Sequence, residues 1–266
     1  MRLLSKMIEM VRKFNFTFLP VSLMLAVFLA GSCTSSTMSQ SDKDGFVRIF
    51  DGKTLKGWSG DPTYWRVENG SLVGEITPAT LLKNNTFIVW EGGQPADFEL
   101  KTEFRISPEG NSGINYRSER LPDLPYALKG YQADIDGKIR YTGQNYEERG
   151  RTTLAYRGQK TAIVGQENPT ASLRDNVKNN AWNGLTVTES LGDTDDLKKH
   201  IKSDDWNEIH LIVKGNRLQH YVNGVLMSDV TDNDPVNRKM AGMLGVQVHV
   251  GPPMKVEFRN MRLKQL

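Results

Sequence analysis

The sequence predicts an all-β protein, a single antiparallel β-sandwich of jelly-roll type, and three observations support this fold class. Apolar and polar residues alternate with a period of two along many segments, as they do in strands with one buried face. Gly, Pro and Asn interrupt these segments at short intervals, and no segment has the strand–helix–strand spacing of a parallel sheet. No internal repeat is present, so an antiparallel sandwich is the favoured architecture.

The N-terminus carries a predicted export signal, residues 1–32. Basic side chains lie near its start, and an almost wholly apolar run extends from Phe16 to Ala30. Such a run is short for a membrane span, which takes about 20 residues. Small residues then lead to Cys33, so we expect a bacterial lipoprotein signal peptide with lipidation at Cys33. An ordinary signal peptide followed by an incidental cysteine is the alternative, and it implies the same export.

The rest of the chain divides into a short tether, residues 33–45, and one domain, residues 46–266. The tether is polar and rich in Ser, which leaves a domain mobile beside a membrane. We expect a lipoprotein of the cell envelope, periplasmic or attached to the outer membrane, that meets the membrane through its lipid anchor only. Cys33 is the single cysteine, so disulfides and a thiol nucleophile are not expected in the domain.

The charge balance bears on the partners of the domain. Lys and Arg number 34 against 31 Asp and Glu, and part of that excess belongs to the signal peptide. The exported domain is therefore close to neutral, and nucleic acid is not an expected partner.

Strands are expected throughout the domain. Phe98–Ile106 alternates apolar with charged residues, and Asn223-Gly224 offers a favoured two-residue turn between two strands. A single short helix is expected within 185–203. The expected strands include residues 98–106, 112–117, 130–137, 206–213, 217–222, 225–230, 245–250 and 255–263.

Three of these segments place polar side chains on one face of the predicted sheet. In 130–137, the apolar Tyr131, Ala133 and Ile135 point to the core, and in 245–250 the three valines do the same. If the strands share one sheet, its outer face carries Asn115, Arg117, Gln132, Asp134, Asp136, Gln247 and His249.

This polar face is suited to a sugar. A sugar ring presents many hydroxyl groups, which Asn, Gln, Asp and Arg side chains recognise by donating and accepting hydrogen bonds. The alternative is an ordinary solvated face of an antiparallel sheet. Such faces usually mix Lys, Glu and Thr, as residues 99–105 do, whereas this face is poor in Lys and rich in amides and Asp.

Six motifs resemble those of the 3-keto-disaccharide hydrolase family, and the resemblance runs from about Phe46 to Leu266. The motifs are FDGKTLKGW (50–58), YWRVENG (64–70), GNSGINYR (110–117), GYQADID (130–136), YEERG (146–150) and GPPMKVEFRN (251–260). The resemblance implies a concanavalin-like jelly roll and cleavage of bacterial glycosides already oxidised to a ketone at C3.

The substrate that this resemblance implies suggests a mechanism. A ketone at C3 acidifies the proton on C2, so a base can form an enolate that expels the C1 substituent by β-elimination. Water addition then completes a net hydrolysis. His249 and either Asp134 or Asp136 are the expected acid and base, and Arg117 is the expected stabiliser of the enolate. The assignment of acid and base among them stays open.

Six further residues are expected to bind substrate. An ion-pair network of Glu147, Glu148 and Arg149 that fixes their loop is the alternative for that segment, and the facing of Glu75 is ambiguous. The expected binding residues are Glu75, Asn115, Gln132, Glu148, Arg149 and Gln247.

No cofactor and no required metal are expected. Asp134 and Asp136 with His249 have suitable ligand types, but no established ligand spacing supports a metal site. Two other functions stay open, a non-catalytic lectin-like module and a retaining glycosidase. The glycosidase needs two carboxylates about 5–5.5 Å apart, which Asp134 and Asp136 could imitate.

Overall fold

The computed structural model describes residues 42–168, 173, 180 and 182–266. The predicted signal peptide, Cys33 and most of the predicted tether lie outside the described residues. Within the described part, no helix is both long and apolar enough to cross a membrane.

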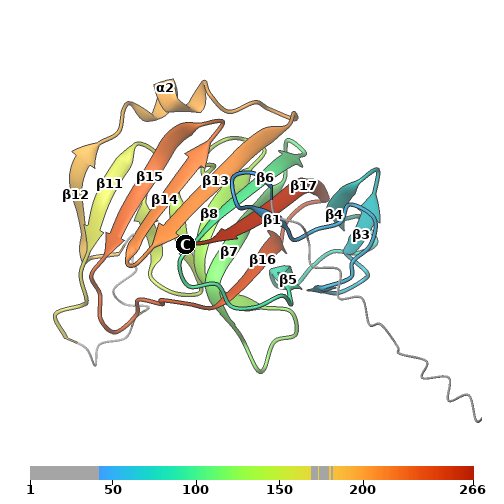
Figure 1. Cartoon of the computed structure of the whole chain (residues 1–266), viewed down its shortest axis with the longest axis horizontal. Helices are drawn as coiled ribbons and strands as arrows, with labels where there is room; N and C mark the ends of the chain where they lie inside the picture. The colour runs from blue at the N-terminus through green and yellow to red at the C-terminus, as the bar shows by residue number, and fades with distance from the viewer. Residues whose placement is uncertain (1–41, 169–172, 174–179, 181) are drawn as a thin grey trace, which may run out of the picture. The chain divides into compact units, whose positions relative to one another are not determined.

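Two β-sheets pack face to face, which confirms the predicted sandwich (Figure 1). All their strand pairs are antiparallel except β11 with β15. The large sheet has ten strands, in the order β12 (Leu185–Ser190), β11 (Gln159–Ile163), β15 (Val225–Asp232), β14 (Arg217–Val222), β13 (Asn207–Lys214), β6 (Phe98–Ile106), β17 (Met254–Gln265), β4 (Ser71–Ile76) and β3 (Trp65–Glu68), with β1 (Val47–Arg48) paired to β17.

The small sheet has seven strands and contains all three segments whose polar residues were expected to share a face. Its order is β10 (Thr152–Ala155), β9 (Asn145–Glu148), β8 (Leu128–Asp136), β7 (Asn111–Arg120), β16 (Met243–Val248), β5 (Thr86–Trp90) and β2 (Trp58–Ser59).

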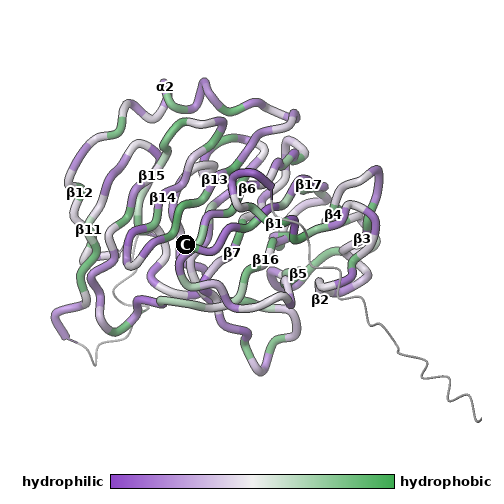
Figure 2. The backbone as a smooth tube through the Cα atoms, in the orientation of Figure 1, coloured by the Kyte–Doolittle hydropathy of each residue, from purple (hydrophilic) through white to green (hydrophobic). Residues whose placement is uncertain are grey.

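The core lies between the sheets and is built from alternate residues of each strand. Along β6 every second residue from Phe98 to Ile106 is buried, and the charged residues between them are partly exposed. Figure 2 shows hydrophobic and hydrophilic stretches interleaved along the strands. Each fully buried Phe or Leu contributes roughly 1.5–3 kcal/mol, so this alternation specifies which face of the sheet is buried.

The hairpin between β14 and β15 turns at Asn223-Gly224, as predicted. Both residues have positive φ, 50° and 80°. A type I′ turn requires this conformation at its two central residues, and Asn and Gly adopt it most readily.

The expected helix in 185–203 is confirmed over a shorter range, because α2 spans only Thr194–Lys198. The Asp193 side chain caps it by accepting hydrogen bonds from the backbone N–H groups of Asp195 and Asp196. The preceding segment Leu185–Ser190 is strand β12 instead. Its β-branched residues favour the extended conformation, which pairs with β11 at the edge of the large sheet.

One predicted core residue lies at the surface. β16 ends at Val248, and the Val250 side chain is 37% exposed. The strand ends just before Gly251-Pro252-Pro253, and proline cannot continue the hydrogen-bond ladder. Alternation therefore stops applying two residues earlier than the sequence suggested.

Candidate functional site

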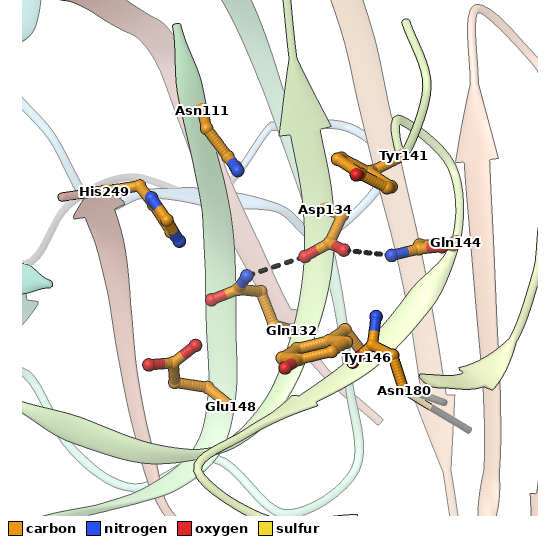
Figure 3. A pocket seen from close by; sticks show the side chains of 9 residues that line it. All are labelled: Asn111, Gln132, Asp134, Tyr141, Gln144, Tyr146, Glu148, Asn180 and His249. Atoms are coloured by element: carbon orange, nitrogen blue, oxygen red, sulfur yellow. Dashed lines mark hydrogen bonds between the residues drawn. The ribbon is translucent and has the colours of Figure 1, made fainter. Parts of the chain in front are cut away.

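A cavity of about 270 Å³ opens on the outer face of the small sheet (Figure 3). Strands β7, β8 and β9, the loop between β8 and β9, and the residue that follows β16 supply most of its walls. Its lining residues are Asn111, Gln132, Asp134, Tyr141, Gln144, Tyr146, Glu148, Asn180 and His249. We call this cavity the central pocket.

The small sheet curves around the central pocket. Glu148 lies on β9, and Asn85 immediately precedes β5, so three strands separate their positions in the sheet. The Asn85 Nδ2 nevertheless donates a hydrogen bond to Glu148 Oε1 at 3.1 Å. The outer face must therefore be concave for these two side chains to meet across it.

A glycine on β7 lets a row of amides cross this face. Gly113 pairs with Asp134, and a Cβ atom added to Gly113 would lie 2.5 Å from the Gln132 side chain. With no side chain there, the Gln132 carboxamide lies over β7, and its Oε1 accepts a hydrogen bond from Gln247 Nε2 at 3.2 Å. Gly113 is therefore required for close side-chain approach.

Asp134 lies at the centre of the central pocket between two carboxamides. Gln132 Nε2 donates to Oδ1 at 2.6 Å, and Gln144 Nε2 donates to Oδ2 at 2.5 Å (Figure 3). Burial raises the pKa of Asp134 to about 7, although these two hydrogen bonds oppose the shift. The nearby Glu148 and Asp136 charges contribute to this increase. The carboxyl group therefore exchanges its proton near neutral pH, as a general base or acid requires.

Gln144 is held in place from the interior of the sandwich. Its backbone carbonyl accepts two hydrogen bonds, one from His220 Nδ1 and one from the backbone N–H of Asp134, each at 3.3 Å. The Tyr116 hydroxyl donates to the other nitrogen of His220 at 2.8 Å. Burial lowers the pKa of His220 to about 4, so the ring is neutral and has this fixed donor pattern. His220 is therefore a buried histidine with both ring nitrogens hydrogen-bonded.

His249 and Glu148 lie on one side of Asp134, and Tyr141, Gln144 and Asn180 lie on the opposite side (Figure 3). The His249 Nδ1 lies 2.7 Å from the Val250 carbonyl oxygen, which can only accept a hydrogen bond. Nδ1 therefore carries hydrogen, and Nε2 is the nitrogen that can exchange a proton with a ligand.

Tyr146 adds a hydroxyl donor to the central pocket. It pairs with Gln132 in the register of β8 and β9, so both side chains point to the same face. Burial, together with the nearby Glu148 and Asp134 charges, raises the pKa of Tyr146 to about 12. The phenol therefore keeps its proton at neutral pH and can donate a hydrogen bond to an oxyanion.

The structure brings four of the residues expected from sequence into the central pocket, and two more contact those four. Gln132, Asp134, Glu148 and His249 line it. Gln247 donates to Gln132, and the Arg149 Nε lies 3.6 Å from Glu148 Oε1.

Asp136 does not line the central pocket, although it follows Asp134 on the same face of β8. Its carboxylate accepts hydrogen bonds from the backbone N–H groups of Arg140, Tyr141 and Thr142, each at 2.9 Å. The Thr142 hydroxyl donates to it at 3.0 Å. Asp136 therefore shapes the loop that carries Tyr141 and Gln144, since a carboxylate that accepts four hydrogen bonds is fully occupied.

Arg117 also lies away from the central pocket. Its guanidinium donates to the backbone carbonyls of Ala96, Gly215 and Lys239 and pairs with Asp97 at 3.0 Å. Its side chain is fully buried. The β7–β8 register shifts between Tyr116 and Glu119, so a β-bulge redirects this side chain from the face that alternation assigns to it.

Two other expected binding residues are also absent from the walls of the central pocket. Glu75 lies on β4 of the large sheet and pairs with Arg66 at 2.7 Å. Asn115 belongs to the small sheet but is fully buried, with its Nδ2 3.5 Å from the Ser118 hydroxyl.

Sequence reasoning missed five lining residues, Asn111, Tyr141, Gln144, Tyr146 and Asn180. Alternation could have found three of them, because Gln144 and Tyr146 share the parity of Glu148, and Asn111 shares that of Asn115. No comparable signal existed for Tyr141 and Asn180. Glu147 has the opposite parity to Glu148 and pairs with the buried Arg151 at 2.7 Å. The ion-pair role left open for this segment is therefore seen at Glu147 and also between Glu148 and Arg149, whose charged atoms lie 3.6 Å apart.

The described residues contain no group of three or more His, Cys, Asp or Glu side chains arranged to hold a metal ion. The central pocket itself combines two buried carboxyl groups, Asp134 and Glu148, with one histidine and several amide and phenol donors.

Comparisons with known proteins identify a matching family and a relative. The family described as "3-keto-alpha-glucoside-1,2-lyase-like domain" matches residues 45–264. A 3-keto-disaccharide hydrolase from Bacteroides thetaiotaomicron is 26% identical, over 85% of this chain and 80% of the relative.

Two solved structures show the same fold. One is a proposed glycosyl hydrolase from Parabacteroides distasonis, with 21% identity, a TM-score of 0.52 and coverage of 84% of this chain and 94% of the other. The second is a galectin-like protein of unknown function from Bacillus subtilis, with 13% identity, a TM-score of 0.50 and coverage of 79% and 90%.

Proposed function

We propose that this chain, which belongs to the family of 3-keto-alpha-glucoside-1,2-lyase-like domains, cleaves 3-keto glycosides. The proposed reaction eliminates the substituent at C1. The related protein named 3-keto-disaccharide hydrolase supports a net hydrolysis of such substrates. The central pocket supports the choice of mechanism, as its residues provide the groups that an elimination needs.

The observation that carries this proposal is Asp134, a buried carboxyl group with a pKa of about 7 at the centre of the pocket. Its ionised form is a stronger base than an exposed carboxylate. We assign it the removal of the C2 proton, which the C3 ketone acidifies. The electron pair from the C2–H bond moves toward the ketone and forms an enolate.

Hydroxyl and amide donors take the role that the sequence suggested for Arg117. The Tyr146 hydroxyl stays protonated, and Asn111 and Asn180 add amide donors to the pocket walls. We propose that these donors bind the substrate and stabilise the enolate oxygen. Among the described lining residues there is no Lys or Arg.

His249 is the proposed acid for the leaving group. When the enolate collapses, the C1–O bond breaks, a C1=C2 double bond forms, and the imidazolium of His249 gives its proton to the departing oxygen. Water then adds its oxygen to C1 and gives a proton back to His249, and Asp134 returns its proton to C2. The second step regenerates the enzyme and yields the free 3-keto sugar, so the sum of both steps is hydrolysis.

The function is tested by following aglycone release from a chromogenic 3-keto-glucoside and from its unoxidised parent. We expect release from the keto compound only, with and without chelator. Asp134→Asn should abolish release, and Asp195→Asn, which changes an exposed carboxylate of α2, should not. Release from the unoxidised parent would indicate an ordinary glycosidase. Binding of the keto compound without release would favour the alternative, a non-catalytic carbohydrate-binding module.

We also propose that the mature protein is a lipoprotein of the cell envelope, anchored at Cys33. The basic and apolar segments before this cysteine support the proposal. Metabolic labelling with a fatty acid should mark the wild type and not Cys33→Ala. Labelling of both proteins would contradict lipidation at this residue.

A further inference from the structure

A second cavity, of about 360 Å³, lies immediately beside the central pocket. The turn Asp61–Tyr64, the segment Leu81–Thr86 and the loop Leu124–Tyr126 contribute its walls. We call this cavity the tyrosine groove, because Tyr64 and Tyr126 both line it.

Asn85 connects the tyrosine groove to the central pocket. It lines the groove, while its Nδ2 donates to Glu148 at 3.1 Å and its Oδ1 accepts from the Val250 N–H at 2.9 Å. Glu148 is a wall of the central pocket, and Val250 follows His249 directly. Asn85 therefore links the two cavities on the side of the pocket where His249 and Glu148 lie (Figure 3).

The lining of the tyrosine groove resembles a ring-binding surface. Two phenol rings and the side chain of Leu82 are partly buried, and Leu81 is 58% exposed. Asp61 and Asn84 add polar groups at the same groove. Apolar ring faces combined with a few hydrogen-bonding groups are typical of small-molecule sites.

The backbone at Tyr126 is a second, independent observation. Its φ is +54°, in the left-handed region that bulky residues rarely adopt. The Tyr126 carbonyl accepts a hydrogen bond from the Phe87 N–H at 2.9 Å, which ties the strained residue to β5. Strain of this kind persists where the surrounding structure enforces it, and it is concentrated at functional sites.

We propose that the tyrosine groove is the subsite for the leaving group, and that it takes a second sugar ring. This inference rests on the proposed function, since it assumes that the oxidised ring occupies the central pocket. C1 of that ring then faces His249, and its substituent extends past Asn85 into the groove. The apolar face of the second ring packs on Tyr64 or Tyr126, and its hydroxyls reach Asp61 and Asn84.

The test compares a 3-keto disaccharide with methyl 3-keto-glucoside of the same anomeric configuration, because a methyl group is too short to enter the groove. Leu81→Trp fills the groove at an exposed position. Tyr126→Asn removes a ring and keeps a residue that tolerates positive φ. Tyr156→Asn is the control, because this tyrosine is 42% exposed and lies outside both cavities.

For the disaccharide we expect each groove variant to raise KM roughly tenfold, which corresponds to about 1.4 kcal/mol. For the methyl glycoside we expect both kinetic constants to be unchanged. Equal losses on both substrates, or no loss on either, would overturn the subsite. Activity of the wild type on the methyl glycoside tests the proposed function alone.

Calorimetry in the Asp134→Asn background measures the subsite without turnover. The 3-keto disaccharide should bind more weakly when Leu81→Trp is added, and methyl 3-keto-glucoside should bind equally to both proteins. This result would support the groove even if the wild type cleaved neither compound. Equal disaccharide affinity in both proteins would contradict it.

Discussion

The outward faces of β6 and β8 follow the same alternating pattern but provide carboxylates with different partners. On β6, Glu103 accepts hydrogen bonds from Arg259 at 2.7 Å and from Asn260 at 2.7 Å. Partial burial alone would raise the pKa of Glu103, but these partners hold it below its usual range. On β8, Asp134 has two neutral amides instead, and burial raises its pKa to about 7.

The two carboxylates differ in their depth of burial and in the charge of their partners. A cation stabilises a carboxylate and fixes it in the ionised form, which is suited to a structural surface. A neutral amide orients a buried carboxyl group while leaving both protonation states accessible. Period-two alternation alone therefore does not identify a functional face. Burial and the partners on neighbouring segments together determine whether a carboxyl group can exchange a proton near neutral pH.

Asp134→Asn should have the largest effect, because it removes the proposed base. We expect kcat/KM on a 3-keto glycoside to fall by roughly 10³-fold. In the wild type, kcat/KM should decrease as the pH falls through about 7, where Asp134 becomes protonated. Activity above one tenth of the wild-type value in the variant would exclude Asp134 as the base.

Stability gives a second, independent measurement of the same residue. The folded pKa of about 7 exceeds the unfolded value of about 4, so the folded state binds more protons within this window. The contribution of Asp134 to stability therefore decreases as the pH rises from about 4 to 7. Relative to Asp134→Asn, wild-type unfolding free energy should fall by about 2–4 kcal/mol between pH 4 and pH 8. Chemical denaturation at both pH values measures this change.

Arg117→Met should have the next largest effect, on stability and not on chemistry. The change leaves three backbone carbonyls without their buried donor, which costs about 3 kcal/mol. Denaturant unfolding measures the loss, with the exposed Lys199→Met as the control. The folded variant should keep kcat near the wild-type value. A hundredfold loss of kcat with unchanged stability would instead support a direct catalytic role.

Local alternation was sufficient to predict the sandwich and the sheet face that carries the pocket. It identified the core side of β6, and it placed Gln132 and Asp134 opposite Tyr131 and Ala133. The Asn223-Gly224 turn was likewise predicted from two adjacent residues. These features depend on residues that are near one another in sequence.

The composition of the pocket depends on long-range features that alternation does not contain. The bulge after Tyr116 directs the Arg117 side chain away from the pocket. Backbone N–H groups of the loop after β8 donate hydrogen bonds to the Asp136 carboxylate. Glu148 reaches the site because the sheet curves, as its contact with Asn85 shows. None of these directions follows from the sequence near the residue concerned.

Gln144→Met removes one of the two neutral amide donors to Asp134 and so tests how these donors set its pKa. The lost hydrogen bond favoured the ionised carboxylate, so the pKa of Asp134 should rise further. We expect the midpoint of the pH–rate profile to move up by about one unit and activity at pH 7 to fall roughly fivefold. Gln219→Met, on the outer face of the large sheet, is the matched control. An unchanged midpoint would show that Gln144 does not tune this group.

Glu103→Gln should have the smallest effect, although it removes a carboxylate with two close partners. The Glu103 and Arg259 side chains are 29% and 38% exposed, so solvent screens their ion pair. We expect a loss of about 0–1 kcal/mol in unfolding free energy, measured by chemical denaturation, and no change in kcat/KM. The glutamine keeps an oxygen that can accept from Asn260, so the hydrogen bond at 2.7 Å need not be lost. A loss above 2 kcal/mol would show that β6 carboxylates contribute more than exposed ion pairs usually do. The contrast with Asp134 would then lie in the function of the two faces and not in their energetic importance.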